Sequence, residues 1–325
     1  MKLDYPIKFI PILKERIWGG DKLSRLFGKE KTNLPIGESW EISAVPDAIS
    51  VVENGHFKGK NLQELINIYK ADFLGEAVYD RYGETFPLLI KIIDAQANLS
   101  VQLHPDNQLA QKRHQSFGKE ELWYIMQADK QSRLFFGFNK PLDQATYKKY
   151  LEEGRLQEVL HEEVVKKGAV YHIPTGRVHA IGSGIVLAEI QQSSDVTYRL
   201  FDWNRTDSAG NSRELHTDLA LDAIDFTPVE HFETYYRTAN NMFRDIIKTP
   251  FFNVKIIKLK TKKQILTTSV DSFVIYICVK GSGFINVESM QVPINEGESL
   301  LIPAKLKKYS ITPNGKMKLL YVKAR

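Results

Sequence analysis

The sequence predicts an all-β protein with helical insertions, on the strength of two observations. Short segments rich in Val, Ile, Tyr and Phe recur along the 325 residues and are separated by Gly, Pro, Asn and Asp, as is typical of strands joined by turns. Helical periodicity is found in only three places. Strands therefore outnumber helices and do not alternate with them as they do in an α/β chain.

The predicted strands fall into two regions of the chain. Those of the first region are residues 39–44, 50–52, 86–93, 134–136 and 184–190. From about residue 250 the same pattern recurs, with predicted strands at residues 252–257, 273–279, 283–287 and 299–302. Two separate sets of strands suggest two similar folding units.

The three predicted helices have recognisable ends. Residues 62–69 follow Asn61, a favourable N-cap residue. Residues 144–153 end at Gly154, which suits the position after a helix C-cap. Residues 216–223 form a third, short candidate. All three are expected to be insertions in the β framework.

Composition and charge restrict the class of protein. Hydrophobic residues make up 43% and charged residues 26%, which are ordinary values for a globular chain. The net charge of +5 comes with scattered lysines, so we expect no nucleic-acid partner, whereas a small anionic substrate would fit. Cys278 is the single cysteine, which excludes an intrachain disulfide and thiolate-rich metal sites. Without a signal-peptide pattern or a run of ~20 apolar residues, we expect a cytoplasmic protein that does not bind membranes.

Four polar side chains form a candidate metal site. Along a strand Gln102 and His104 point to the same face. A strand-like run from Ala169 to Ile173 leads into a Pro-x-Gly turn that presents His179, and Glu121 begins another strand-like run. Two imidazoles, a carboxylate and an amide oxygen on strands of one β-barrel can bind a divalent ion, zinc above all, with manganese, iron or cobalt possible.

Each of these residues alone also has an ordinary explanation. His104 precedes a Pro-Asp turn, Glu121 follows the charged pair Lys119-Glu120, and His179 lies in a glycine-rich loop. Histidines and carboxylates in such places are usually not metal ligands. It is their joint occurrence with the turn motif that favours a metal site.

One spacing occurs in both regions of the chain. Five residues separate Gly168 from Pro174 and Gly297 from Pro303, and the fifth residue after the proline is His179 in the first copy and Lys308 in the second. A lysine cation cannot bind a metal cation. We therefore expect a degenerate internal repeat, with a catalytic domain at residues 1–238 and a second domain without metal ligands at residues 239–325.

The turn motif resembles the second signature of the cupin superfamily, and Gln-x-His stands where many cupins carry His-x-His. More specifically, the chain resembles the type I mannose-6-phosphate isomerases in their shorter bacterial form. The resemblance covers nearly the whole chain, and it is carried by ERIWGG (15–20), GESWE (37–41), FPLLIK (86–91), LSVQLHPD (99–106), GKEELWY (118–124), PTGRVHA (174–180) and DVTYRLFDWNR (195–205).

The resemblance implies two cupin-type jelly-roll barrels and a zinc enzyme that interconverts mannose 6-phosphate and fructose 6-phosphate through an enediol(ate). The family's metal ligands fall on the four residues of the candidate metal site. The resemblance further implies that four residues are catalytic, namely Arg199, Lys119, Glu189 and Asp195. It also implies that two residues bind the substrate, namely Arg205 and Lys91. Glu120 departs from the Thr or Pro that the family often has there, and we expect it to face solvent.

The reaction explains why these groups would be needed. A cation stabilises the negative charge that develops on the sugar oxygens, and a positioned acid/base moves the proton between C1 and C2. Lys119, Glu189 or Asp195 could supply that acid/base, and the sequence does not choose among them. Arg199 suits the bound sugar or its charge, and the Arg205 guanidinium suits a phosphate.

Two other functions stay open at this stage. A cupin dioxygenase or another sugar-phosphate isomerase is possible, although Gln102, Lys119 and Arg199 favour a hydroxylated, anionic substrate. A sugar-binding sensor or storage protein is also possible, but two barrels would leave no residues for a signalling module. The oligomeric state, monomer or homodimer, cannot be read from the sequence.

Overall fold

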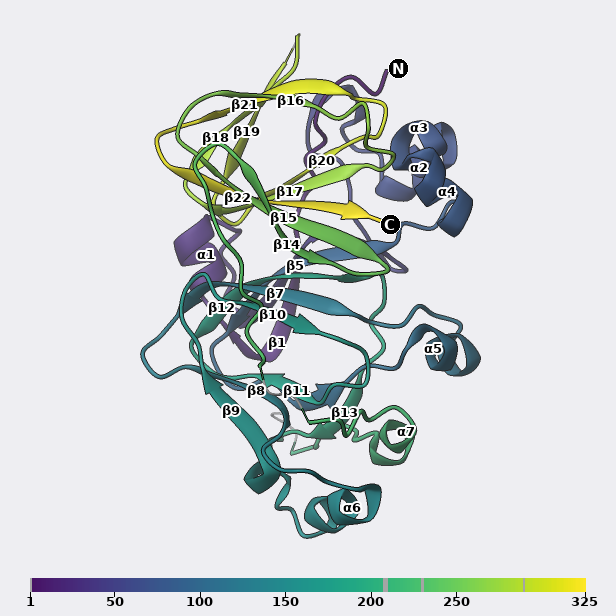
Figure 1. Ribbon diagram of the computed structural model, residues 1–325, viewed down its shortest axis with the longest axis vertical. Coiled ribbons are helices and arrows are strands. Elements are labelled where there is room, and N and C mark those ends of the chain that lie inside the picture. The colour runs from purple at the N-terminus through teal and green to yellow at the C-terminus, as the bar shows by residue number, and fades with distance from the viewer. Residues whose placement is uncertain (1, 207–209, 229–230, 289) are drawn as a thin grey trace.

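Strands dominate the computed structural model, which describes residues 2–206, 210–228, 231–288 and 290–325. Two sheets make up the lower half of Figure 1, with strand orders β1-β2-β5-β12-β7-β10 and β13-β6-β11-β8-β9. Their strands are β1 (Ile12–Gly20), β2 (Ile36–Ile42), β5 (Leu88–Ala95), β6 (Val101–Leu103), β7 (Glu121–Ala128), β8 (Arg133–Phe138), β9 (Leu160–Val164), β10 (Val170–Ile173), β11 (His179–Ile181), β12 (Ile185–Gln192) and β13 (Tyr198–Phe201).

Two further sheets make up the upper half, with strand orders β14-β15-β22-β17-β20 and β16-β21-β18-β19. Their strands are β14 (Phe243–Lys248), β15 (Phe252–Leu259), β16 (Lys263–Leu266), β17 (Val274–Lys280), β18 (Ser282–Asn286), β19 (Gln291–Asn295), β20 (Ser299–Ile302), β21 (Lys308–Pro313) and β22 (Met317–Ala324). A small hairpin of β3 (Ala44–Val45) and β4 (Ala48–Ile49) completes the strands of the described chain. All nine strands expected from the sequence lie at or next to observed strands or bridges, so the prediction of a mostly β protein is confirmed.

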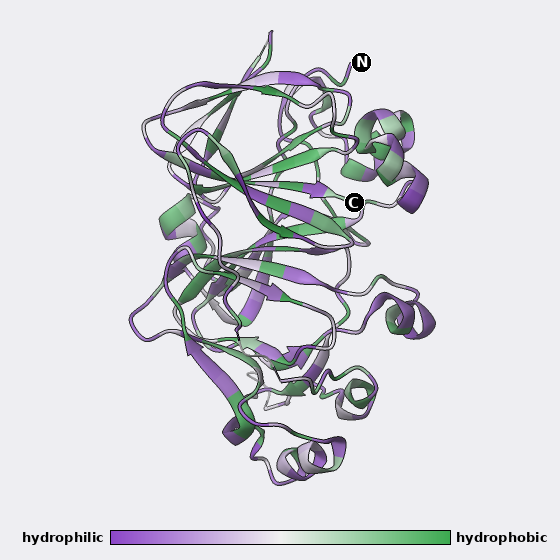
Figure 2. Cartoon of the chain, viewed as in Figure 1, coloured by the Kyte–Doolittle hydropathy of each residue, from purple (hydrophilic) through white to green (hydrophobic). Residues whose placement is uncertain are grey.

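Apolar clusters fill the spaces between successive sheets. Trp123 and Phe136 lie in the cluster between the two lower sheets. Ile90 of β5 belongs, together with Ile256 of β15 and Leu320 of β22, to the cluster between the two halves. Every residue of β5 and β12 is buried, which explains why both strands read as long apolar runs. Figure 2 shows the same hydrophobic concentration on the central strands.

The helices lie at the periphery of the sheets (Figure 1). They are α1 (Lys22–Phe27), α2 (Leu62–Tyr69), α3 (Ala71–Leu74), α4 (Glu76–Tyr82), α5 (Asn107–His114), α6 (Gln144–Glu152) and α7 (Thr217–Leu221), with 3-10 turns at Gly55–Phe57 and Leu156–Val159. The prediction for α2 is confirmed, and its cap is a full capping box between Asn61 and Glu64. Among the described residues, no helix has the length and apolar character needed to cross a membrane.

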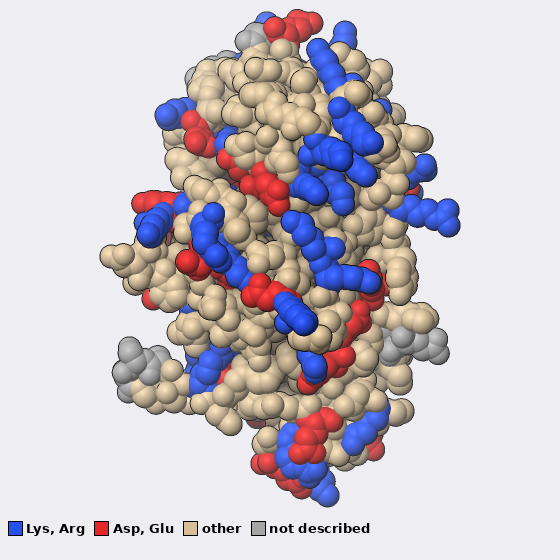
Figure 3. Space-filling view, turned by 90° about the vertical axis from the view of Figure 1, so that its left-hand side faces the viewer, with Lys and Arg blue, Asp and Glu red and all other residues tan. Residues whose placement is uncertain are grey.

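Charged side chains of both signs cover the face shown in Figure 3, with Lys and Arg gathered on its upper part. Several exposed charges are paired, among them Arg155 with both Glu153 and Glu158. Exposed pairs of this kind add little stability, typically about 0–1 kcal/mol. The fold therefore depends mainly on its apolar clusters.

The repeated spacing corresponds to repeated structure. Gly168 and Gly297 have φ angles of +91° and +84°, and β10 and β20 each begin two residues later. The next strand begins at His179 in one copy and at exposed Lys308 in the other. The two copies thus share the order left-handed glycine, strand, turn and strand. The domain boundary at residue 238 stays a prediction.

Gly297 also packs closely against α1, which leads to a prediction. A Cβ atom on Gly297 would lie 2.4 Å from Cγ of Phe27 in α1. Gly297→Ala should therefore lower the free energy of unfolding by about 1–3 kcal/mol more than backbone strain alone does. Urea denaturation measures the loss. The control is Gly315→Ala, since Gly315 has a similar φ of +81° and no atom within 4 Å of its Cβ position; equal losses would contradict the prediction.

Candidate active site

Three buried side chains from separate elements converge between the two lower sheets. His104 Nε2 lies 3.4 Å from Glu121 Oε1, and His179 Nε2 lies 3.8 Å from Glu121 Oε2. The two imidazole rings are 4.9 Å apart, and each of the three residues is 1% exposed. One ligand atom from each lies within 4.8 Å of the others, so a single ion could contact all three.

Strand pairing brings the fourth predicted ligand to the same place. Gln102 of β6 is directly opposite His179 of β11 on one side and Arg199 of β13 on the other. Side chains opposite each other on neighbouring strands lie on the same face. The Ser100 hydroxyl donates to Gln102 Oε1 at 3.3 Å.

Backbone contacts fix which imidazole nitrogens are available. Nδ1 of His104 is 2.9 Å from the Val196 carbonyl oxygen, and Nδ1 of His179 is 2.8 Å from that of Arg177. Because a carbonyl oxygen can only accept, each Nδ1 carries the hydrogen and each Nε2 carries a lone pair. Among the described groups, His179 Nε2 and Glu121 Oε2 have no hydrogen-bond partner. These buried atoms, each with a free lone pair, are suitable ligands for a zinc-type ion.

The charges around the cluster also fit a metal. Lys119 Nζ lies 2.9 Å from Glu121 Oε1 and 3.3 Å from His104 Nε2. Burial, with the Lys119 charge, lowers the pKa of His104 to about 3. Burial opposes ionisation of Glu121, yet the Lys119 ammonium holds the pKa of that carboxyl well below its usual range. Neutral imidazoles and an ionised carboxylate are the forms that bind metals.

A cavity of about 540 Å³ opens beside this cluster. Six of the ten predicted site residues line it, and these are Lys91, Gln102, Lys119, Glu189, Asp195 and Arg199. They come from both lower sheets, so the cavity lies between the sheets. The structure therefore brings the expected acid/base groups together with the candidate ligands.

Glu189 of β12 lies at the cavity. In the six-stranded sheet it is opposite Lys91 of β5 and Trp123 of β7. Glu189 Oε1 is 3.0 Å from Lys91 Nζ, and Trp123 Nε1 donates to Glu189 Oε2 at 2.9 Å. Burial would lower the pKa of Lys91, but Glu189 and Glu38 raise it above its usual value. The carboxylate is thus held in one position by two donors.

Two predicted residues lie farther from the cluster. Asp195 lines the cavity but is exposed. Arg205 is not among the cavity-lining residues, and its Nε and Nη1 donate to the carbonyl oxygens of Asp202 and Asn98 at 3.2 and 2.7 Å. Glu120, expected to face solvent, is instead 8% exposed and lies 3.2 Å from His172 Nε2. That expectation was wrong, because Glu120, the residue before β7, packs against His172 of β10.

Several lining residues had not been predicted. Arg16, Trp18, Glu38 and Trp40 belong to β1 and β2, and they stand within the ERIWGG and GESWE segments that carry the family resemblance. Those segments could therefore have indicated that these four residues belong to the site. Arg213, which also lines the cavity, lies in a loop with no strand or helix periodicity to mark it.

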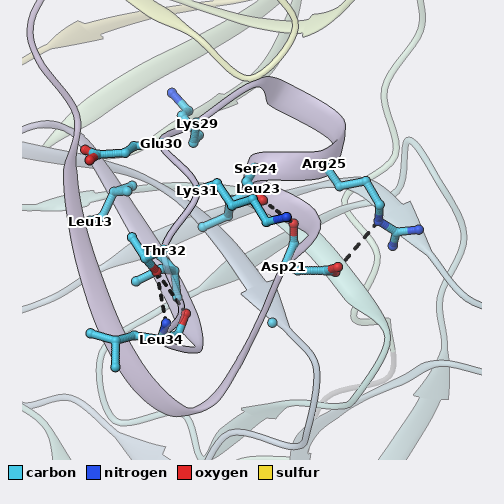
Figure 4. Close-up of a pocket in the computed structure, with 12 residues that line it drawn as sticks. Leu13, Asp21, Leu23, Ser24, Arg25, Lys29, Glu30, Lys31, Thr32 and Leu34 are labelled. Carbon is cyan, nitrogen blue, oxygen red and sulfur yellow. Dashed lines mark hydrogen bonds and ion pairs between the residues drawn. The ribbon is translucent and has the colours of Figure 1, made fainter.

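Figure 4 shows a second cavity, of about 350 Å³, between α1 and residues 29–34. Three of its five charged lining residues are paired, Asp21 with Arg25 at 3.7 Å and Lys29 with Glu41 at 2.8 Å. The hydroxyl of Thr32 is engaged with the backbone of Leu34. The cavity beside the His–Glu–His cluster is therefore the better candidate for an active site.

Comparison with known proteins identifies the family. A model of the type I phosphomannose isomerase catalytic domain matches residues 7–153, and a model of the mannose-6-phosphate isomerase cupin domain matches residues 243–323. The chain is 35% identical to mannose-6-phosphate isomerase ManA of Bacillus subtilis over 94% of this chain and 95% of that protein.

Solved structures agree with this relationship. The crystal structure of the mannose 6-phosphate isomerase from Bacillus subtilis matches with a TM-score of 0.87 at 30% identity, covering 98% of this chain and 99% of that one. A mannose 6-phosphate isomerase bound with zinc and yttrium has the same fold, with a TM-score of 0.78 at 18% identity and the same coverage of 98% and 99%. The chain therefore belongs to the type I phosphomannose isomerases, a family of enzymes that interconvert an aldose and a ketose.

Proposed function

We propose that this protein interconverts mannose 6-phosphate and fructose 6-phosphate, with a bound zinc ion, through an enediol(ate). The observation that carries the proposal is the buried cluster of His104, Glu121 and His179, which opens on a cavity lined by acid/base groups and arginines. An isomerase of this kind needs a cation, a proton carrier and an anion-binding group around one sugar.

Four side chains would hold the metal. They are Gln102 through its amide oxygen, Glu121 through its carboxylate, and His104 and His179 through Nε2. When bound, zinc would act as a Lewis acid that stabilises negative charge on the sugar oxygens at C1 and C2. The carbonyl groups of Val196 and Arg177 keep the two imidazoles in the required tautomer and orientation.

The proton on C2 must move to C1 on one face of the sugar. Lys119 and Glu189 both lie in the cavity and are buried, whereas Asp195 is exposed. The geometry therefore favours Lys119 or Glu189 for this proton transfer, with Asp195 nearer to solvent. Lys91 would orient Glu189 and contact the sugar hydroxyls, and Arg199 would bind the anionic end of the substrate.

The proposal extends to the fold. Each pair of sheets would form a cupin barrel, with residues 1–238 as the catalytic domain and residues 239–325 as a domain that supports it. The cupin-domain match at residues 243–323 and the repeated glycine–strand–turn order support this division. Lys308 in place of His179 explains why only the first barrel would bind metal.

Removal of the metal tests the function directly. A coupled assay follows fructose 6-phosphate formed from mannose 6-phosphate before chelation, after chelation and after zinc is added back. We expect turnover to disappear with the chelator and to return with zinc, because the proposed mechanism needs a Lewis acid at the sugar oxygens.

Two results would contradict this expectation. Full turnover by protein shown to be free of metal would rule out the metal-dependent mechanism. Absence of turnover by protein shown to contain zinc would rule out mannose 6-phosphate as the substrate and favour another sugar phosphate.

A further inference from the structure

Three arginines share one buried carboxylate at the side of the cavity. Asp202 is 6% exposed. Its Oδ2 accepts from Arg213 Nε at 2.7 Å, and its Oδ1 accepts from Nη2 of Arg213 and Nη2 of Arg205, both at 2.5 Å. Arg199 also acts electrostatically on this group. Among the described residues, this carboxylate therefore balances one of three positive charges.

Other carboxylates near the arginines compensate this charge weakly. The Glu214 side chain is 84% exposed and Asp195 is exposed, so water screens both. Burial, followed by the charge of Arg213, lowers the pKa of Arg199. Excess positive charge at a partly buried site favours the binding of a dianion.

The three arginines differ in the groups that they leave available. Arg205 donates from all three of its nitrogens to Asp202 and Asn98 and does not line the cavity. Arg213 lines the cavity, uses Nε and Nη2 on Asp202, and has no hydrogen-bond partner for Nη1 among the described groups. Arg199 lines the cavity, donates from Nη1 to the Glu214 carbonyl at 2.7 Å, and has a buried Nε without a partner.

Arg16, which also lines the cavity, is less available. Its Nη2 donates to the Glu38 carboxylate at 2.9 Å, and its Nη1 donates to the Glu15 carbonyl at 3.0 Å. Lys119 and Lys91 are each paired with a buried carboxylate. Among the described cavity-lining cations, Arg199 and Arg213 therefore remain to receive an anion.

We propose that Arg213 anchors the phosphate of the sugar phosphate together with Arg199, and that Arg205 is a positioning residue that holds Asp202 and through it Arg213. This inference rests on the proposed function. The two hydrogen bonds to Asp202 fix the plane of the Arg213 guanidinium and leave its Nη1 available. Selectivity for a phosphorylated sugar thus depends on a loop residue, whereas the acid/base candidate Glu189 lies on β12.

The test compares Arg213→Gln with wild type in the zinc-loaded protein. We expect kcat/KM for mannose 6-phosphate to fall about 10- to 100-fold, as for loss of hydrogen bonds to a charged group, mainly through KM. The binding of inorganic phosphate, measured by calorimetry, should weaken by a similar factor. Arg213→Lys should recover part of the loss, because it restores the charge without the guanidinium geometry.

Control variants separate the possible outcomes. Arg237→Gln removes an exposed arginine and should change neither quantity. Arg205→Gln should weaken phosphate binding less than Arg213→Gln. Unchanged phosphate binding in a folded Arg213→Gln protein would overturn the inference, as would a larger loss in Arg205→Gln.

This design also distinguishes the inference from the proposed function. If wild-type protein binds phosphate through Arg213 but does not turn over mannose 6-phosphate, the reaction assignment fails and the anion site stands. If wild-type protein turns over mannose 6-phosphate and Arg213→Gln does so equally well, only the role of Arg213 is overturned.

Discussion

His179→Ala is expected to remove the bound metal and the isomerase activity together. His179 Nε2 is buried without a partner, and its ring is held by the Arg177 carbonyl. Loss of this ligand leaves Gln102, His104 and Glu121, and we expect metal affinity and kcat/KM to fall by on the order of 100-fold or more, since even indirect changes around a metal cost 10- to 100-fold. Metal analysis after dialysis and the coupled assay measure both quantities.

The matched control is His231→Ala, which removes an exposed imidazole and should keep both metal and activity. Because His179 is buried, a thermal melt must show that the His179→Ala protein is folded. Metal retained at the wild-type level in folded His179→Ala protein would show that the ligand assignment is wrong. Metal lost with activity retained would instead contradict the metal-dependent mechanism.

The sequence predicted those features of the site that depend on residues close together in the chain. The predicted strand at residues 184–190 corresponds to β12, which carries Glu189, and the Pro-x-Gly turn correctly marked the loop before His179. These features depend on neighbouring residues and a period of two. They do not indicate which strands are neighbours, so the pairing of His179 with Gln102, and of Gln102 with Arg199, appears only in the structure.

Helices were predicted only where an apolar face marks them. The capping residue and apolar spacing of α2 made it recognisable, whereas α5 buries only Ala110 and has Leu109 as its one other apolar residue. The pair α3 and α4 is divided by Gly75, whose φ of +94° interrupts the helical pattern. Helices without an amphipathic stripe give little sequence signal, because tertiary packing rather than periodicity stabilises them.

Arg213 illustrates a different limit. It reaches the cavity from a loop, and its position depends on Asp202 and on Arg205, which lies eight residues earlier in the chain. No periodicity relates these three residues. Which of Arg205 and Arg213 can bind a phosphate depends on the hydrogen bonds that each guanidinium makes. Only the folded structure shows these bonds.

Arg199→Ala is expected to keep the metal while kcat/KM for mannose 6-phosphate collapses. Arg199 is opposite Gln102 on the neighbouring strand but is not itself a candidate ligand. Its buried Nε without a partner makes it the cavity-lining cation best placed to bind charge that the substrate brings. Loss of one preorganised donor typically costs 10²- to 10³-fold in rate, so we expect kcat/KM to fall by at least about 100-fold at unchanged zinc content.

Two comparisons make this result specific to Arg199. Arg199→Lys keeps the charge but not the guanidinium geometry, and should be intermediate. Arg213→Gln should act mainly on KM, whereas Arg199→Ala should lower kcat as well, because Arg199 lies opposite Gln102, one of the proposed metal ligands. Loss of zinc in Arg199→Ala would show that the arginine supports the metal site through β6, and wild-type kinetics would exclude a role in substrate binding.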